Sequence, residues 1–135
     1  MNLKSSLVII ALGVSSAVFA ADVDTSKLPP ASTKTGVTYA TDIKPILDAS
    51  CIKCHGAQKP KAKLRLDTLA GVLKGSENGK DVEPGNSAKS VVVLNVAHLG
   101  DEDDFMPPPK NKMGLKQLTP EQVGLIRAWI DQGAK

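Results

Sequence analysis

Apolar residues recur at helical spacing in two segments of the chain, one before its middle and one at its end. In the first, residues 41–51, they share one helical face: Ile43, Ile46, Leu47 and Cys51. Thr41 or Asp42 can cap this helix, and Pro45 falls in its first turn, where the missing N–H costs no intrahelical hydrogen bond. The pattern therefore predicts a short helix that ends at Cys51.

The helix predicted at the end of the chain has the clearer boundaries. Thr119 as N-cap, Pro120 at the first helical position and Gln122 three residues after the cap form a capping box. Gly133 is placed to end the helix. The buried face is predicted to hold Val123, Ile126, Trp129 and Ile130. Gly124 costs about 1 kcal/mol of helix propensity, which a close approach of another backbone would offset.

The middle of the chain contains weaker signals. Residues 63–75 predict an extended pair of leucines and then a short helix capped near Asp67, and residues 76–86 are loop by composition. Residues 87–100 contain a β-branched run that favours a strand, but no second convincing strand is present to pair with it. We therefore expect a helix there. Residues 101–114 contain three consecutive prolines and are expected to hold no regular structure.

The first residues have the order of a secretory signal peptide. Lys4 precedes an apolar run from Leu7 to Leu12, and small residues lead up to Ala20, after which cleavage is expected. An uncleaved membrane anchor is the alternative, but the run is shorter than the roughly 20 apolar residues that a span requires. We expect a signal peptide at residues 1–20, a flexible Pro/Thr/Ser-rich leader at 21–37 and one domain at 38–135. Export to a bacterial periplasm is the predicted localisation.

The composition leaves little bulky material for a core. Aromatic residues make up 3% of the chain, which also has 9 prolines and 11 glycines. Small domains of this kind usually gain stability from a disulfide, a metal or a large cofactor. The net charge of +3 implies no extended basic face, which argues against nucleic acid as a partner. A monomer is expected, but short helices and loops fix no symmetric interface, so the sequence leaves the oligomeric state open.

The chain's two cysteines lie in "CIKCH", residues 51–55. A dithiol oxidoreductase would place Cys-X-X-Cys after a strand in a βαβ unit, but a helical pattern precedes it here. A zinc site needs four ligands, and only His98 is available as a further nitrogen ligand. A structural disulfide would leave His55 without a role. In a c-type cytochrome all three residues are used, because Cys51 and Cys54 add to the haem vinyl groups and His55 ligates the iron. We therefore predict one covalently bound haem c.

A second axial ligand can come from three residues. Met106 lies in "FMPPP", where the prolines that follow it make the loop rigid. Met113 is flanked by lysines and a glycine and is expected in a surface loop. His98 is more readily interpreted as an ordinary loop histidine. Met106 is therefore the predicted sixth ligand, with His98, Met113 or an open site as alternatives.

The order of motifs resembles a known family. An aromatic residue and "DIKPIL" precede "CIKCH", and "LRLDT", "PGNSAKS", "MPPP" and "LTPEQVGLIRAWIDQGA" follow it. This order is similar to that of the planctomycete-type cytochrome c domain, a class I-like monohaem cytochrome, over residues 38–134. The resemblance implies an all-α cytochrome c fold, with three to five short helices and long loops around one haem. It also implies that the helix before Cys51 crosses the terminal helix near Gly124, and that His55 and Met106 are the axial ligands.

The predicted function is transfer of single electrons between a redox donor and a redox acceptor, without catalysis and without a small-molecule substrate. A six-coordinate iron would leave no position for a substrate. A haem enzyme or gas sensor with a labile Met106 is the first alternative, and the dithiol oxidoreductase is the second. Lys59, Lys61 and Lys63 could steer an acidic partner toward the haem edge, or they could simply be solvated. The acidic run Asp101–Asp104 has no assigned role.

Overall fold

The computed structural model describes residues 23–135, so the predicted signal peptide at 1–20 lies outside the described residues. Within that range the fold is all-α, as predicted, and contains no strand. Its α-helices are α1 (Lys44–Ser50), α2 (Ile52–His55), α3 (Leu69–Lys74), α4 (Val91–Val96) and α5 (Pro120–Asp131). A π-helical turn, η2 (Tyr39–Ile43), precedes α1. Single 3-10 turns are η1 (Thr25–Lys27), η3 (Lys61–Lys63), η4 (Ser87–Lys89) and η5 (Glu102–Asp104).

The helix that leads to Cys51 begins earlier than its sequence suggests. The turn η2 runs directly into α1, and its N-cap is Thr38, whose side chain accepts a hydrogen bond from the Thr41 backbone N–H. The predicted cap, Thr41 or Asp42, is therefore inside the helical segment. The predicted apolar face is confirmed, because Ile43, Ile46, Leu47 and Cys51 are all buried.

The start of α5 agrees with its prediction in detail. The Thr119 side chain accepts from the Gln122 backbone N–H, and the Gln122 side chain accepts from the Thr119 backbone N–H at 2.9 Å. The predicted face of α5 is buried as well, with Val123, Ile126, Trp129 and Ile130 each at most 2% exposed. The helix presents this apolar face to the rest of the fold.

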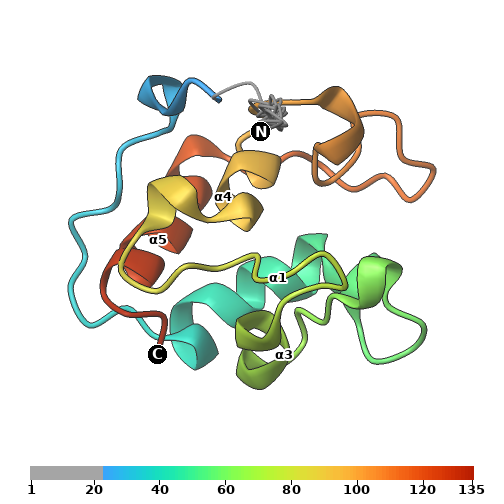
Figure 1. Cartoon of the computed structure of the whole chain (residues 1–135), viewed down its shortest axis with the longest axis horizontal. Helices are drawn as coiled ribbons and strands as arrows, with labels where there is room; N and C mark the ends of the chain where they lie inside the picture. The colour runs from blue at the N-terminus through green and yellow to red at the C-terminus, as the bar shows by residue number, and fades with distance from the viewer. Residues whose placement is uncertain (1–22) are drawn as a thin grey trace, which may run out of the picture.

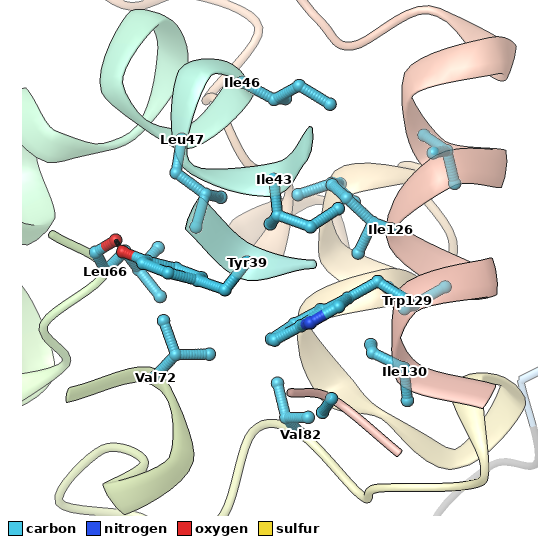
Figure 2. Close-up of a cluster of buried hydrophobic side chains, with 14 of the residues drawn as sticks. Tyr39, Ile43, Ile46, Leu47, Leu66, Val72, Val82, Ile126, Trp129 and Ile130 are labelled. Carbon is cyan, nitrogen blue, oxygen red and sulfur yellow. Dashed lines mark hydrogen bonds between the residues drawn. The ribbon is translucent and has the colours of Figure 1, made fainter. Parts of the chain in front are cut away.

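The main core lies between α5 and the segment that runs from η2 into α1 (Figure 2). Tyr39 and Trp129 meet here with their ring centroids 6.1 Å apart. Val72 on α3 and Val82 in the following loop close the cluster from below in that view. Figure 1 shows α4 and α5 in one half of the molecule and α1 and α3 in the other.

The predictions for the middle of the chain hold except at one turn. Leu64 has an extended backbone, Leu64 and Leu66 are both buried outside any helix, and α3 follows with Thr68 as its cap. The ambiguous segment 87–100 forms η4 and α4, so the helical prediction is confirmed. Residues 101–114 were expected to be irregular throughout, but η5 forms a 3-10 turn that the Asp101 side chain caps by accepting from the Asp103 N–H. An acidic side chain at a helical N-terminus stabilises it.

The described part of the expected leader, residues 23–37, packs along α5. The Ser32 backbone N–H donates to the Gly124 carbonyl at 2.9 Å, and the Arg127 side chain donates to the Pro29 carbonyl. A Cβ at Gly124 would lie 2.6 Å from the Pro30 carbonyl oxygen. The close backbone approach predicted at Gly124 is thus made by the leader. The family resemblance implied that the helix before Cys51 crosses α5 near Gly124. This expectation is wrong, because the leader lies against Gly124 and the helical segment before Cys51 contacts α5 through η2.

The last residue is tied back to the start of the domain. The Lys135 carbonyl accepts from the Tyr39 backbone N–H at 2.9 Å and from the Trp129 indole N–H at 2.8 Å. This connection brings the C-terminus to the beginning of η2 (Figure 1). Among the helices of residues 23–135, none has the length and apolar character that crossing a membrane demands.

Candidate haem-binding site

The motif "CIKCH" forms a tight helical turn at the end of α1. The Cys51 backbone N–H donates to the Leu47 carbonyl, which ends α1, and the Cys51 carbonyl accepts from the N–H groups of Cys54 and His55 at 3.1 and 3.0 Å. Residues three and four positions apart lie on the same side of such a turn. Cys51, Cys54 and His55 accordingly line one cavity, and both cysteines are free thiols.

This cavity has mostly apolar walls and an empty volume of about 520 Å³, counting the space at its open mouth. Most of its lining comes from the motif, the leucine pair that follows it, α4 and the proline-rich loop, and Ser50 of α1 and Asp81 complete it. Its apolar lining residues outside the motif are Leu64, Leu66, Val92, Val96, Met106, Pro107, Pro108 and Leu115. Walls of this kind suit an apolar ligand, and the donor groups of the motif are part of the same lining.

The imidazole of His55 is fixed by backbone. Its Nδ1 lies 3.2 Å from the Leu64 carbonyl oxygen, and the residue is 8% exposed. Since a carbonyl only accepts, Nδ1 carries the proton and Nε2 is left with its lone pair for a metal. Burial lowers the pKa of His55, an effect that the Leu64 hydrogen bond only partly offsets. The neutral imidazole, which is the form that ligates metals, is therefore favoured.

The Cys51 thiol is protonated at neutral pH. Burial raises the pKa of Cys51 to about 11, and the nearby Cys54 thiol adds to the shift. A protonated, buried sulfur makes a poor attacking thiolate for disulfide exchange. An uncharged thioether at the same position would involve no buried charge. The environment of Cys51 thus favours a covalent haem attachment over dithiol redox chemistry.

Met106 reaches the same cavity from the proline-rich loop. Its side chain is half-buried, and its backbone N–H donates to the Asn95 carbonyl at the end of α4 at 3.0 Å. Met113 is 43% exposed and lies in a separate surface depression. His98 is not among the residues that line the cavity. Of the three residues considered as sixth ligands, the structure brings Met106 together with His55.

Other groups at the site were not identified from the sequence. Asn111 fastens the loop after Met106, because its side chain accepts from the Leu115 N–H and donates to the carbonyls of Leu115 and Pro108. Leu115 and Pro108 thereby become part of the cavity wall. Val92 and Val96 are spaced by one helical turn, which was the only sequence signal for their shared position. The closure of a loop by a side-chain amide, as at Asn111, leaves no periodic pattern in the sequence.

A more polar depression adjoins the cavity and shares His55, Asn95 and Met106 with it. Asp104, at the end of the acidic run, is part of its wall, and so is Ala62 of η3. Lys59, Lys61 and Lys63 are all exposed, and Lys63 pairs with Glu77 at 3.4 Å. The three lysines line neither the cavity nor the depression, but Ala62, which lies between Lys61 and Lys63, is part of the wall of the depression.

The site was tested against the alternative cofactors. Within residues 23–135, no three or more His, Cys, Asp and Glu side chains are grouped to hold a metal ion, as a zinc site would require. A covalent haem fits better, because two thiols, an imidazole with a free Nε2 and a thioether sulfur surround one apolar cavity.

Comparison with known families agrees with this geometry. Residues 51–110 match the model of a family described as Planctomycete cytochrome C. The matched range contains the whole motif, the extended pair, α3, α4 and Met106, whereas α5 lies outside it. No curated protein and no solved structure matches the chain.

Proposed function

We propose that the chain, whose residues 51–110 match the Planctomycete cytochrome C model, is a haem-binding protein of electron transfer, an exported monohaem cytochrome with His55 and Met106 as axial ligands. The observation that carries this proposal is the convergence of Cys51, Cys54, His55 and Met106 on one apolar cavity. Bound haem supplies an iron that accepts and returns one electron. The roles of the side chains follow from their positions.

Cys51 and Cys54 hold the haem through two thioethers. Cys51 follows α1 directly and Cys54 lies in α2, so an attached haem would be held by residues that the buried face of α1 positions. His55 offers Nε2 to the iron, because Nδ1 is committed to the Leu64 carbonyl. Such a contact around a metal-binding histidine fixes the ring orientation and raises its basicity. Met106 offers its thioether sulfur, a ligand that favours the ferrous state and raises the reduction potential.

An electron carrier is favoured over a haem enzyme or gas sensor with a labile sixth ligand. The Met106 loop is anchored on both sides, at Asn95 through the Met106 N–H and at Asn111 through the following turn. A sulfur held in place in this way would occupy the coordination position that a substrate would need. The protein therefore moves single electrons between a donor and an acceptor and acts on no small molecule.

The partners are proposed to be redox proteins with acidic docking surfaces. Lys59, Lys61 and Lys63 are exposed, and Ala62 of the same segment borders the depression that adjoins the cavity, where a haem edge would be accessible. Electrostatic attraction at such a surface mainly increases the rate of encounter. A periplasmic location follows from the proposed signal peptide, and an oxidising compartment suits a chain whose only thiols are used in haem attachment.

The test is expression with a haem-maturation system and export, followed by mass analysis and visible spectra of the purified protein. We expect the mass of the polypeptide plus one haem, and a denatured pyridine spectrum typical of two thioether bonds. The matched control is the double variant Cys51→Ser/Cys54→Ser, which should carry no covalent haem. A wild-type mass equal to the polypeptide alone, with two thiols that react with an alkylating reagent, would overturn the proposal and favour the dithiol alternative.

A further inference from the structure

The imidazole of His98 contacts the residues on both sides of Met106. Its Nε2 lies 3.1 Å from the Pro107 carbonyl oxygen. Its ring stacks on Phe105, with the centroids 4.6 Å apart and the planes at 13°. We propose that His98 is a positioning residue, which holds the Met106 sulfur at the sixth coordination position. This inference rests on the proposed function, because it concerns the same site.

The hydrogen bond defines what His98 can do. The Pro107 carbonyl can only accept, so Nε2 of His98 carries the proton and donates it. In this arrangement that nitrogen has no lone pair for a metal. His98, which the sequence left open as a sixth ligand, therefore acts on the ligand loop and not on the iron.

The backbone around His98 adds a third connection. His98 follows α4 and has a positive φ of 54°, a conformation that non-glycine residues rarely adopt. Its N–H donates to the Asn95 carbonyl at 3.2 Å, and the Met106 N–H donates to the same carbonyl at 3.0 Å. The chain therefore leaves α4 at His98 and returns to the same point at Met106. The side chain of His98 closes this loop from inside.

Such a clamp matters because a thioether is a neutral, weakly binding ligand. When the loop that carries it becomes free to move, an added ligand competes more easily for the iron. Groups that orient metal ligands typically affect affinity by 10- to 100-fold. We expect removal of the clamp to act at the lower end of that range, since the Asn95 and Asn111 contacts remain.

The experiment measures how tightly imidazole binds to the ferric holoprotein, by titration in the visible spectrum. His98→Leu removes both the donor and the stacking ring and should tighten imidazole binding roughly tenfold. His98→Phe keeps a ring against Phe105 but removes the donor, and should tighten it roughly threefold. Ser87→Ala is the control, because it removes buried hydrogen bonds to Asp131 and Arg127 away from this loop. It should lower the unfolding midpoint and leave imidazole affinity unchanged.

The outcomes separate the two proposals. A wild-type ferric spectrum without the sulfur-to-iron charge-transfer band would overturn Met106 ligation, and the positioning role with it. A wild-type band combined with wild-type imidazole affinity in both His98 variants would overturn the positioning role alone. If His98→Leu does not fold, His98→Phe still decides the question. Tightening in Ser87→Ala equal to that in His98→Phe would also overturn the proposal, because it would show a general loss of stability.

Discussion

His55 is hydrogen-bonded to the segment around Leu64 twice, once through its side chain and once through its backbone carbonyl. Nδ1 of His55 lies 3.2 Å from the Leu64 carbonyl oxygen, and two residues further on the Leu66 N–H donates to the His55 carbonyl at 2.8 Å. The extended pair therefore runs alongside the motif and carries the acceptor that orients the imidazole. A segment without helix or sheet pairing thus determines the tautomer of the proposed iron ligand.

The first prediction concerns the Nδ1 proton of His55. In the reduced, diamagnetic holoprotein this proton should give an NMR resonance that exchanges slowly with solvent, because the ring is buried and the proton is hydrogen-bonded. The measurement is an exchange experiment on ¹⁵N-histidine protein. The Nε2 proton of half-buried His98 provides an internal comparison and should exchange faster. A His55 proton that exchanges as fast as that of His98 would contradict the arrangement.

The second prediction distinguishes the methionines. Met106→Ala should abolish the sulfur-to-iron charge-transfer band of the ferric protein, and the ferrous protein should then bind carbon monoxide. Met113→Ala is the matched control, since its side chain is 43% exposed outside the cavity, and it should leave both spectra unchanged. Carbon monoxide binding by the wild-type ferrous protein would instead favour the sensor or enzyme alternative.

The parts of the fold that depend on neighbours in sequence were predictable. The capping box at Thr119, the apolar face of α1 and the extended Leu64–Leu66 pair follow from residues within a few positions of one another. The packing of the leader was not predictable, because its polar, proline-rich composition is that of a loop in any context. Its hydrogen bond from Ser32 to Gly124 connects residues far apart in the chain.

In the candidate site, too, the features set by neighbouring residues were predictable and those set by distant contacts were not. The motif residues are adjacent in sequence, and their chemistry identifies them without a structure. The structure brings Met106 to their cavity, as a ligand would need, but ligation itself stays a prediction. The supporting roles of Asn111 and His98 could not be inferred, because a side chain that closes a loop has no periodic pattern. His98 was considered only as a ligand or as a loop residue.

The third prediction tests the charged surface near the cavity mouth with a small anionic oxidant, ferricyanide. At low ionic strength, the triple variant Lys59→Gln/Lys61→Gln/Lys63→Gln should be oxidised several times more slowly than wild type, and the difference should disappear near 1 M salt. The control carries the same charge change at three exposed lysines in other segments, namely η1, η4 and the last residue: Lys27, Lys89 and Lys135. Equal rates for the two triple variants at low salt would contradict local steering.

The last prediction is that Gly124→Ala destabilises the protein, whereas the same substitution usually stabilises a helix. Glycine to alanine in an exposed helix interior stabilises by about 1 kcal/mol. At Gly124, however, the new Cβ would lie 2.6 Å from the Pro30 carbonyl oxygen, and overpacking of this kind costs about 1–3 kcal/mol. Gly124→Ala should therefore lower the free energy of unfolding, measured by denaturant titration of the holoprotein. A stabilised variant would mean that the leader does not pack on α5.

A second variant shows whether the cost arises from the leader itself. Arg127 donates to the Pro29 carbonyl, one residue before the contact at Gly124, so Arg127→Met should let the leader move away from α5. In that background Gly124→Ala should cost less than it does in wild type, because the leader can yield to the added methyl group. Substitutions at contacting residues are coupled in this way, and a double-mutant cycle measures the coupling. If Gly124→Ala and Arg127→Met changed the free energy of unfolding in a strictly additive way, the added methyl group would clash within α5 and not with the leader.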